Sequence, residues 1–404
     1  MISVIKKTKA ILLIFALLFA LTVPFVTVSA ESGFVIDNGI LLSYTGSEKE
    51  ITIPSEVVYI GDNAFRNNTS VEKVVLGQSV MGIGNCAFYG CTSLSSVEQT
   101  ESVGAIGAYA FYNTPYLNNQ KGAFVTINDI LIKYNGGSQT VAIPSNVRVI
   151  SPYTFAYNRN INSVIVGNNV EEIGEGAFYM CGNLSNVDIS ENTAVIGGYA
   201  FYDTPWFKND QRDFLIEGRN ILIDCKSDDK NITIPDDVVT VGTGAFYMSG
   251  LESVTFSENT KVIGMRSFMG CENLKSVNIN DGILLVDTQA FYNCQSLEKA
   301  EIASSVQVIN DKAFVKDNLT IYGEKGSVAE SFANANDIPF NGGGILGDLD
   351  GDGVLTISDA TYLQGYIAGI KNEEPDMSIA DVNGDGSISI TDVSKLQMII
   401  AGEH

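Results

Sequence analysis

The sequence predicts a mainly β repeat solenoid followed by a small α-helical domain. A block reading Ile-Gly-x-x-Ala-Phe recurs along the chain, and a strand-like pattern Leu-x-x-Val-x-Ile follows it wherever the next unit is regular. Beyond a glycine-rich stretch at residues 341–347, the repeats stop and the composition changes. The Phe of the block stands at Phe65, Phe88, Phe111, Phe155, Phe178, Phe201, Phe246, Phe268, Phe291 and Phe314, in steps of 22 or 23 residues except for one step of 44 and one of 45.

The two long steps belong to a larger repeat of about 90 residues. An Ile-Pro pair marks each copy at Pro54, Pro144 and Pro235, and apolar runs begin at Phe34, Phe124 and Phe214. The triplets at 114–116 and 204–206 mark the places where an insertion replaces a coil.

A single coil of this length cannot bury its own apolar face, so stacked coils must share one core. The alternating strand pattern predicts parallel ladders about 4.8 Å apart. The ten Phe are expected to form one internal column, and the glycine of the block to form a tight corner. Side chains are expected to fill the interior, which leaves no barrel-like pocket. A short helix within 324–340 is expected to seal the last coil.

The repeated block resembles the bacterial BspA-like leucine-rich repeats, and the solenoid is assigned to residues 31–340. The resemblance implies a curved surface module with protein-binding or adhesive roles, and no catalysis.

The N-terminus has the features of a secretory signal peptide over residues 1–30. Lys6, Lys7 and Lys9 precede an apolar run at 11–21, and Val28-Ser29-Ala30 reads as a cleavage site. No later segment is apolar enough to span a bilayer. The mature chain is therefore expected to be secreted, without a membrane span and extracellular, at the cell surface or in a larger complex.

Charge and composition exclude several functions. The formal net charge is −23, and removal of the three Lys in residues 1–30 makes it −26, which disfavours nucleic acid and anionic membranes as partners. The one His is His404, so catalysis that needs an imidazole beside a nucleophile has no candidate. No phosphate-binding glycine motif is present.

Six cysteines are spread through the repeats. Cys91, Cys181 and Cys271 are spaced 90 residues apart, which indicates buried structural positions and not redox chemistry. The sequence leaves open whether Cys271 and Cys294, on neighbouring coils, form a disulfide.

Two twelve-residue loops with the spacing of calcium sites follow the linker. Ca²⁺ takes six to eight oxygen ligands, and a Gly at position 6 allows the sharp turn that such loops need. Asp stands at position 12 of both loops. The loops predict two Ca²⁺ ions, bound by Asp348, Asp350, Asp352, Val354, Thr356 and Asp359, and by Asp381, Asn383, Asp385, Ser387, Ser389 and Asp392.

Each loop is followed by a predicted helix, over 361–368 and 393–401, and no helix is expected before either loop. This duplicated loop–helix unit, assigned to residues 348–404, resembles a type I dockerin. The resemblance implies a cohesin partner on a cellulosome scaffold. The near-symmetry of the two halves also suggests two possible docking orientations. By the same resemblance, the cohesin contacts are Ile357, Ser358, Leu363 and Gln364, with Ile390, Thr391, Leu396 and Gln397 in the second half.

Aromatic residues are the candidate ligand contacts of the solenoid. A Tyr follows the Phe in six blocks, and this row either stacks on sugar rings or forms a ladder of partly buried rings. Trp206, the only Trp, and Tyr116 lie in the insertions and are candidate exposed contacts.

The sequence therefore predicts a secreted, non-catalytic cellulosome component. Its dockerin would bind a cohesin in a calcium-dependent manner, while its solenoid would present a surface to an unknown protein or glycan. One alternative is a polysaccharide-degrading enzyme, which needs two carboxylates around a sugar-sized cleft. A free surface adhesin is the other.

Overall fold

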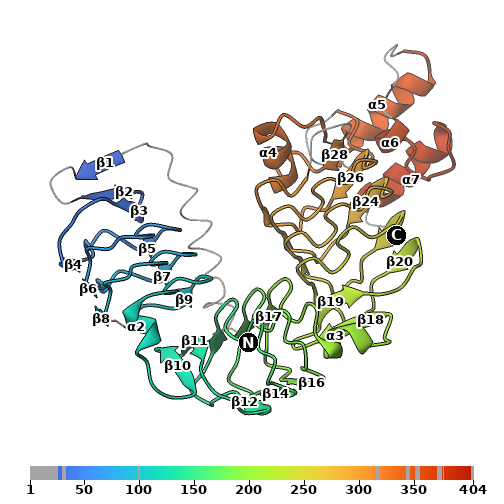
Figure 1. The fold of residues 1–404 in the computed structure, drawn as a ribbon. Coiled ribbons are helices and arrows are strands. Elements are labelled where there is room, and N and C mark those ends of the chain that lie inside the picture. Colours follow the sequence, from blue (N-terminus) through green and yellow to red (C-terminus); the bar gives the residue numbers. More distant parts are fainter. Residues whose placement is uncertain are drawn as a thin grey trace. The chain divides into compact units, whose positions relative to one another are not determined.

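The computed structural model describes residues 33–98, 101–314, 319–342, 346–350, 355–370 and 377–401, together with Pro375 and the strand at 26–29. Figure 1 shows the elements along the chain. Two compact units are present, one within residues 1–210 and the other within 211–404. The boundary falls inside the single solenoid domain expected from the sequence, directly after the second insertion.

In the first unit, short parallel strands form ladders along stacked coils. The first pair of ladders consists of β1 (Val26–Ser29), β2 (Phe34–Asp37), β3 (Ile40–Tyr44), β5 (Tyr59–Ile60), β7 (Gly82–Ile83) and β9 (Ala105–Ile106), and of β4 (Glu50–Thr52), β6 (Lys73–Val75) and β8 (Ser96–Glu98). The second pair consists of β10 (Phe124–Ile127), β11 (Ile130–Tyr134), β13 (Val149–Ile150), β15 (Glu172–Ile173) and β17 (Val195–Ile196), and of β12 (Thr140–Ala142), β14 (Ser163–Val166) and β16 (Asn186–Ile189).

The second unit repeats this arrangement and adds the C-terminal helices. One ladder consists of β18 (Phe214–Glu217), β19 (Ile221–Cys225), β21 (Thr240–Val241), β23 (Val262–Ile263), β25 (Leu285–Val286) and β27 (Val308–Ile309). The others are β20 (Asn231–Thr233) with β22 (Ser253–Thr255), and β24 (Ser276–Ile279) with β26 (Lys299–Ile302), β28 (Thr320–Gly323) and β29 (Phe340–Asn341).

The pairing register confirms the period read from the sequence. Glu50 of β4 lies opposite Lys73 of β6, which in turn lies opposite Ser96 of β8, so each step is 23 residues. In the second unit, Thr240 pairs with Val262, a step of 22 residues. Because side chains alternate along a strand, this register keeps one face of every coil in the core.

Each larger repeat opens with an antiparallel hairpin, and this explains the long steps. In β2–β3, β10–β11 and β18–β19, the Phe that opens the apolar run pairs with Tyr44, Tyr134 or Cys225. A short helix precedes the second and third hairpins: α2 (Pro115–Asn118) and α3 (Pro205–Asn209), each with a Thr N-cap and Pro in its first turn.

The expected single column of ten phenylalanines is wrong. The rings form three stacks instead, over Phe65 to Phe111, Phe155 to Phe201 and Phe246 to Phe314, with ring centroids 4.7–5.2 Å apart. The hairpins and helices of the insertions interrupt the column and close its ends with other aromatic rings. Tyr116 packs on Phe111 at 5.3 Å, and Tyr134 packs on Phe155 at 5.0 Å.

The glycine of the block stands at the corner of the coil, as expected, since the Gly84 carbonyl accepts the N–H of Ala87 at 3.3 Å in the turn that follows the strand. A Cβ at Gly84 would lie 2.7 Å from the backbone nitrogen of Asp62 on the preceding coil. Gly84 also donates its N–H to the carbonyl of Ile60. Gly84 is therefore favoured by close approach between coils, and not by a left-handed backbone conformation.

The last coil is sealed as the sequence predicts. Helix α4 (Val328–Ala335) begins at the N-cap Ser327. Its Phe332 meets the end of the third Phe stack, with its ring centroid 6.0 Å from that of Phe314. One amphipathic helix thereby covers the end of the third Phe stack.

All six cysteines are free thiols, so the open question about Cys271 and Cys294 is answered: they form no disulfide in this structure. Four of them have one structural role. Cys91, Cys181, Cys271 and Cys294 each donate the thiol hydrogen to the carbonyl of a core Phe on an earlier coil, at 3.0–3.1 Å. Burial raises the pKa of Cys91 and of Cys181 to about 11.

In the described residues of the C-terminal domain, the helices are α5 (Ile357–Ile367), α6 (Met377–Ala380) and α7 (Ile390–Ile400). Helices α5 and α7 begin four and three residues earlier than expected, and α6 is a short helix before the second loop that the sequence did not predict. Its separate core contains Leu349, Ala360, Leu363, Ala380, Val382, Val393 and Leu396.

Within the described residues, no helix has the length and apolarity that a membrane crossing requires. Of the expected signal peptide, residues 1–25 and Ala30 lie outside the described part of the chain, and residues 26–29 form β1, which pairs with β2.

Candidate functional site

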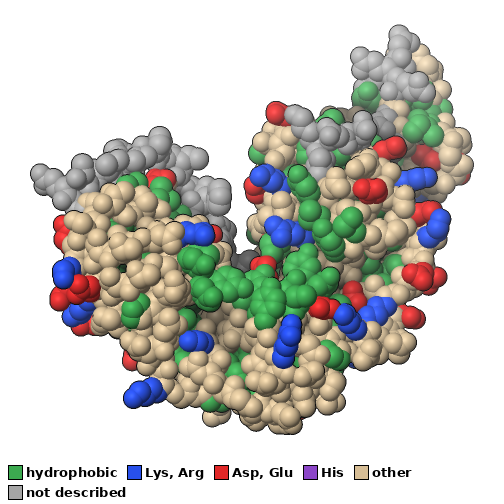
Figure 2. All heavy atoms as spheres, viewed as in Figure 1, with side chains coloured by type: hydrophobic (Ala, Val, Ile, Leu, Met, Phe, Trp, Pro, Cys, Tyr) green, Lys and Arg blue, Asp and Glu red, His purple; other side chains and the backbone are tan. Residues whose placement is uncertain are grey.

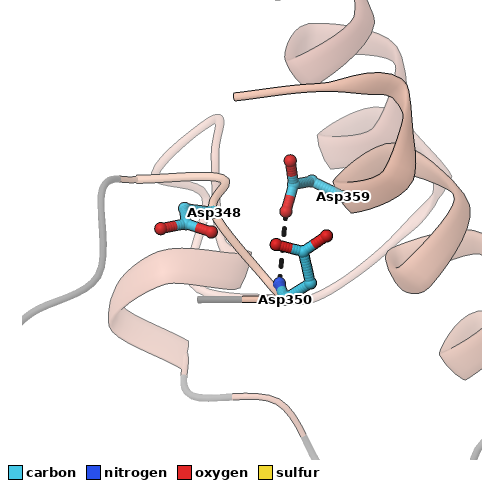
Figure 3. Close-up of side chains that lie close together, drawn as sticks. All are labelled: Asp348, Asp350 and Asp359. Atoms are coloured by element: carbon cyan, nitrogen blue, oxygen red, sulfur yellow. Dashed lines mark hydrogen bonds between the residues drawn. The ribbon is translucent and has the colours of Figure 1, made fainter. Parts of the chain in front are cut away.

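The first loop of the C-terminal domain brings three carboxylates together. Asp348, Asp350 and Asp359 each offer an oxygen, and these oxygens lie within 4.8 Å of one another (Figure 3). Asp348 and Asp359 are almost fully buried. Three anionic groups at this separation repel one another in a partly dry environment, so the arrangement favours a cation among them.

Asp359, at position 12 of the loop, is fixed by hydrogen bonds. One carboxylate oxygen accepts the backbone N–H of Leu349 at 2.8 Å and of Asp350 at 3.2 Å. The other accepts the N–H of Thr356 at 2.8 Å. Burial raises the pKa of Asp359, but the backbone hydrogen bonds from Thr356, Asp350 and Leu349 outweigh burial and hold that pKa below its usual value. The group is therefore a carboxylate at neutral pH.

The second loop repeats the same arrangement 33 residues later. Asp392 accepts the N–H of Asn383 at 3.1 Å and of Ser389 at 2.8 Å, as Asp359 does in the first loop. Asp381 accepts the N–H groups of Gly384 at 2.9 Å and Gly386 at 2.8 Å, so the loop folds around its first carboxylate.

Gly386, at position 6 of the second loop, is one place where glycine is required, because its φ of 83° is strained for other residues. Asp385, at position 5, accepts a hydrogen bond from the Ser387 hydroxyl at 2.7 Å. This hydrogen bond lowers the pKa of Asp385, and the Asn383 side chain makes a smaller contribution in the same direction.

The donor set fits a hard cation. Of the twelve predicted ligands, ten lie in the described residues, and the structure converges Asp348, Asp350 and Asp359 in one loop. The two others, Asp352 and Val354, lie outside the described part of the chain. Oxygen donors alone, with Asp at both ends of each loop, are the ligands that Ca²⁺ prefers.

The predicted partner contacts divide into exposed and buried residues. Ile357 and Ile390 are 62% and 59% exposed, unusually high values for isoleucine. The other exposed members of the set are Ser358, Gln364, Thr391 and Gln397.

Leu363 and Leu396 are a correction to the predicted contact set. Both are fully buried in the core of the C-terminal domain. They lie three residues after Ala360 and Val393, which places each pair on the inward side of its helix. They therefore stabilise the domain and are not available to a partner.

Two exposed hydroxyl residues were missed by the sequence reasoning. Thr361 and Ser394 lie one turn after Ile357 and Ile390 and donate their hydroxyls to the carbonyls of those residues, at 2.8 and 3.0 Å. The helical spacing of four residues could have identified them. The docking face is thus defined as Ile357, Ser358, Thr361 and Gln364 on α5, with Ile390, Thr391, Ser394 and Gln397 on α7.

On the solenoid, Tyr116 and Trp206, the two candidate contacts in the insertions, each pack on the last ring of a Phe stack. Tyr116 is only 7% exposed and packs on Phe111, so the structure corrects its assignment as an exposed contact. Trp206 is half-buried, and its ring meets that of Phe201 edge-on at 4.8 Å. The helices α2 and α3 place both residues over the end of a Phe stack.

The predicted row of tyrosines lies at the surface in short stacks. Tyr89 stacks on Tyr112 at 5.3 Å, and Tyr179 stacks on Tyr202 at 5.5 Å. Tyr112 and Tyr202 are about half exposed, at 51% and 47%. The structure therefore shows the expected ladder of partly buried rings in short stretches, and stacking on sugar rings stays a prediction.

Comparisons with known proteins agree with this division of the chain. Residues 41–130, 120–208 and 222–330, more than half of the chain, match the family described as the BspA type leucine-rich repeat region. Residues 346–401 match the type I dockerin domain. No curated protein matches the chain at a significant level.

Several solved structures of bacterial repeat proteins are similar. A leucine-rich cell surface protein of Faecalibacterium prausnitzii is 22% identical over 73% of this chain and 92% of its own, with a TM-score of 0.30. A leucine-rich repeat protein of Eubacterium ventriosum is 19% identical over 72% and 73%, with a TM-score of 0.28. One from Bacteroides ovatus is 18% identical over 80% and 99%, with a TM-score of 0.26.

The repeat period, the stacked coils and the duplicated loop–helix unit were established above from the chain itself, and the family matches fall on the same residues. This chain belongs to the BspA-type leucine-rich repeat family and carries a type I dockerin domain.

Proposed function

We propose that this chain is a secreted, non-catalytic component of a cellulosome. Its dockerin domain binds a cohesin on a scaffold protein, and its repeat solenoid presents a binding surface for a protein or a glycan. The observation that carries the proposal is the pair of loops ending in Asp359 and Asp392, each joined to a helix with an exposed Ile.

Two Ca²⁺ ions order the dockerin in this proposal. The first ion is held by Asp348, Asp350, Asp352, Val354, Thr356 and Asp359, and the second by Asp381, Asn383, Asp385, Ser387, Ser389 and Asp392. Bound calcium supplies the positive charge that neutralises these carboxylates and so stabilises the start of each exiting helix. Because an ion that binds only the folded state stabilises it, cohesin binding should depend on calcium.

The docking face supports a cohesin contact that is more apolar than charged. The two exposed isoleucines occupy equivalent positions on α5 and α7, with hydroxyl and amide groups beside them. Since the two halves present the same residue types, either half can lead the contact, which predicts two docking orientations.

A non-catalytic role is supported by how the solenoid uses its residues. Most of its apolar side chains are buried in the shared core, and the insertions are occupied by hairpins and capping aromatics. A glycosidase would need a pair of carboxylates across a cleft.

The test is capture of the full chain on immobilised cohesins. In calcium, we expect at least one cohesin of the panel to retain the chain, and a chelator should release it. Retention that is unaffected by the chelator, or no retention by cohesins of any class, would contradict the docking role.

The enzyme alternative has its own test. Incubation of the full chain with plant polysaccharides, without scaffold, should release no reducing sugar above a blank. Release above the blank would establish a hydrolase. A free adhesin would instead bind surfaces while failing every cohesin test.

A further inference from the structure

A cleft of about 540 Å³ lies on the first unit, where the first insertion joins the next regular coil. Tyr89, Tyr109, Tyr112, Tyr153 and Tyr157 line it, and the name tyrosine cleft is used for it below. Figure 2 shows hydrophobic side chains, a class that includes tyrosine, gathered on the face over β9 to β17. The tyrosine cleft is open to the surface.

The rings of the tyrosine cleft form part of a longer aromatic strip. Tyr109 stacks on Tyr153 at 5.1 Å and meets Tyr112 edge-on at 5.8 Å. Tyr153 and Tyr157 both meet Tyr179 edge-on, at 6.2 and 5.6 Å. The strip is extended at one end by the stacked pair Tyr89 and Tyr112 and at the other by Tyr179 and Tyr202. It therefore runs without a break along successive coils of this unit.

The coil at the centre of the cleft departs from the repeat. Where the other blocks read Ile-Gly-x-x-Ala-Phe, or close variants of it, this one reads Ile150-Ser-Pro-Tyr-Thr-Phe155. The two departures are Ser151 in place of Gly and Thr154 in place of Ala, and both line the cleft, together with Pro152 and Tyr153 at the variable positions.

Three of these tyrosines are held in an unfavourable backbone conformation. Tyr109, Tyr153 and Tyr157 have φ values of 55°, 59° and 62°. Asn occupies the position equivalent to Tyr157 on other coils, at Asn67 and Asn113, with φ of 59° and 57°. Positive φ at these two positions recurs on other coils, as at Met180, Tyr199 and Met248, so the conformation belongs to the coil and not to the cleft. Asn tolerates it better than a bulky side chain does, which makes Tyr157→Asn a substitution that the coil accepts.

A buried hydroxyl provides an independent sign of a ligand. The Ser151 side chain is 3% exposed, lines the cleft, and its Oγ has no hydrogen-bond partner in the described part of the chain. A buried polar group without a partner is costly, and a ligand group that reaches it would remove the cost.

The lining identifies the class of ligand. Among the described residues that line the cleft there is one base, Lys133, and no acid, which disfavours a charged polymer. Phenol and serine hydroxyls both donate and accept hydrogen bonds, as sugar hydroxyls do. A proline-rich peptide offers chiefly acceptors. The strip also repeats tyrosine rings on successive coils, and a polysaccharide repeats sugar rings that can stack on them.

We propose that the tyrosine cleft binds a linear, neutral polysaccharide, whose sugar rings lie against the exposed faces of Tyr112 and Tyr157 and whose hydroxyl reaches Ser151. This deepens the binding role proposed above by naming its site and ligand class, and it does not require the dockerin to function.

The test is affinity electrophoresis of the full chain through gels containing xyloglucan, mixed-linkage β-glucan, glucomannan or hydroxyethyl cellulose, with polygalacturonate as the charged comparison. At least one neutral polymer should retard the chain, and polygalacturonate should not. Tyr157→Asn should weaken the retarding interaction about tenfold, by loss of one ring contact. Ser151→Gly, which restores the residue of most other blocks, should weaken it about fivefold.

Both variants should fold, because each introduces a residue that other coils carry at the same place. Tyr157→Asn should melt at the same temperature as the natural chain or higher. The matched control is Met248→Asn, at the equivalent position of a coil in the second unit, with φ of 56° and 67% exposure. It should relieve the same strain and leave retardation unchanged.

Three results would overturn the inference: no retardation by any neutral polymer, full retardation of Tyr157→Asn, or binding of an oligoproline peptide that depends on Tyr157. Loss of cohesin capture with polysaccharide binding intact would instead remove the docking role alone.

Discussion

Thr356 and Asp359 close a capping box at the start of α5: the carboxylate of Asp359 accepts the Thr356 N–H at 2.8 Å, while the Thr356 hydroxyl accepts a helix N–H. Ser389 and Asp392 do the same at the start of α7. The last loop carboxylate thus has two roles, since it begins a helix and faces the proposed ion.

We predict that Asp359→Ala removes one calcium site and loosens α5. The variant should bind one Ca²⁺ where the natural chain binds two, and its dockerin should lose about 1–2 kcal/mol even without calcium, because the capping box is gone. Isothermal titration calorimetry with calcium measures the number of ions bound. Unfolding followed by circular dichroism in the presence of a chelator measures the loss of stability without calcium. Asp392→Ala is the matched variant, and two ions bound by either would count against the assignment.

We predict that the two halves of the docking face can replace each other. Ile357→Asp and Ile390→Asp should each abolish one docking orientation and leave the other, so each should weaken cohesin binding only slightly. The double variant should lose cohesin binding. Surface plasmon resonance against the cohesin that binds best measures this. Leu363→Ala is the contrast, because loss of a buried Leu costs about 2–5 kcal/mol and should destabilise the domain itself. A double variant that still binds would remove the docking face from the contact.

We predict that the Phe stacks stabilise the solenoid. Phe178 is fully buried, with its ring 4.8 Å from that of Phe155 and 5.2 Å from that of Phe201. Phe178→Ala should destabilise its unit by about 3–5 kcal/mol, since it removes a large side chain and leaves a cavity. Tyr247→Ala, at a surface position, should change stability by less than about 1 kcal/mol. Thermal unfolding in calcium compares them, and similar melting temperatures would contradict the account.

We predict that the buried thiols make stability fall in alkali. Burial raises the pKa of Cys181 from 9.0 to about 11, so the folded state holds the proton more tightly than the unfolded state. That stabilisation is complete below the unfolded pKa and is lost as the pH rises through the folded pKa. Between about pH 9 and pH 11, the natural chain should therefore lose about 2 kcal/mol more than Cys181→Ala. Equal losses in the two chains would show that this thiol does not contribute.

Much of the fold could be predicted because the repeat is explicit. The 23-residue spacing of the Phe residues gives the ladder register directly, and the Ser-Val-Ala-Glu segment gives the capping helix α4. The single Phe column failed for a physical reason. The apolar runs at Phe34, Phe124 and Phe214 pair back on themselves as hairpins, and their aromatic partners end each stack.

The candidate sites were predicted less completely. The loop carboxylates follow from spacing alone, but Leu363 and Leu396 were assigned by resemblance without regard to helix phase, and the structure buries them. The tyrosine cleft could not be predicted, because Tyr109 and Tyr153 are 44 residues apart and meet only once the insertion between them has folded. The substitution of Ser151 for glycine was visible, but its lack of a partner was not.

The central claim is that one chain docks through its C-terminal domain and binds through its repeats. The most direct measurement places a bound cohesin on a surface, adds the full chain, and then adds the neutral polysaccharide that it binds best, labelled with a fluorophore. The account predicts that the polymer is retained only with both chain and calcium present, and that a chelator releases chain and polymer together. Retention of the polymer without the chain, or release of neither by the chelator, would contradict it.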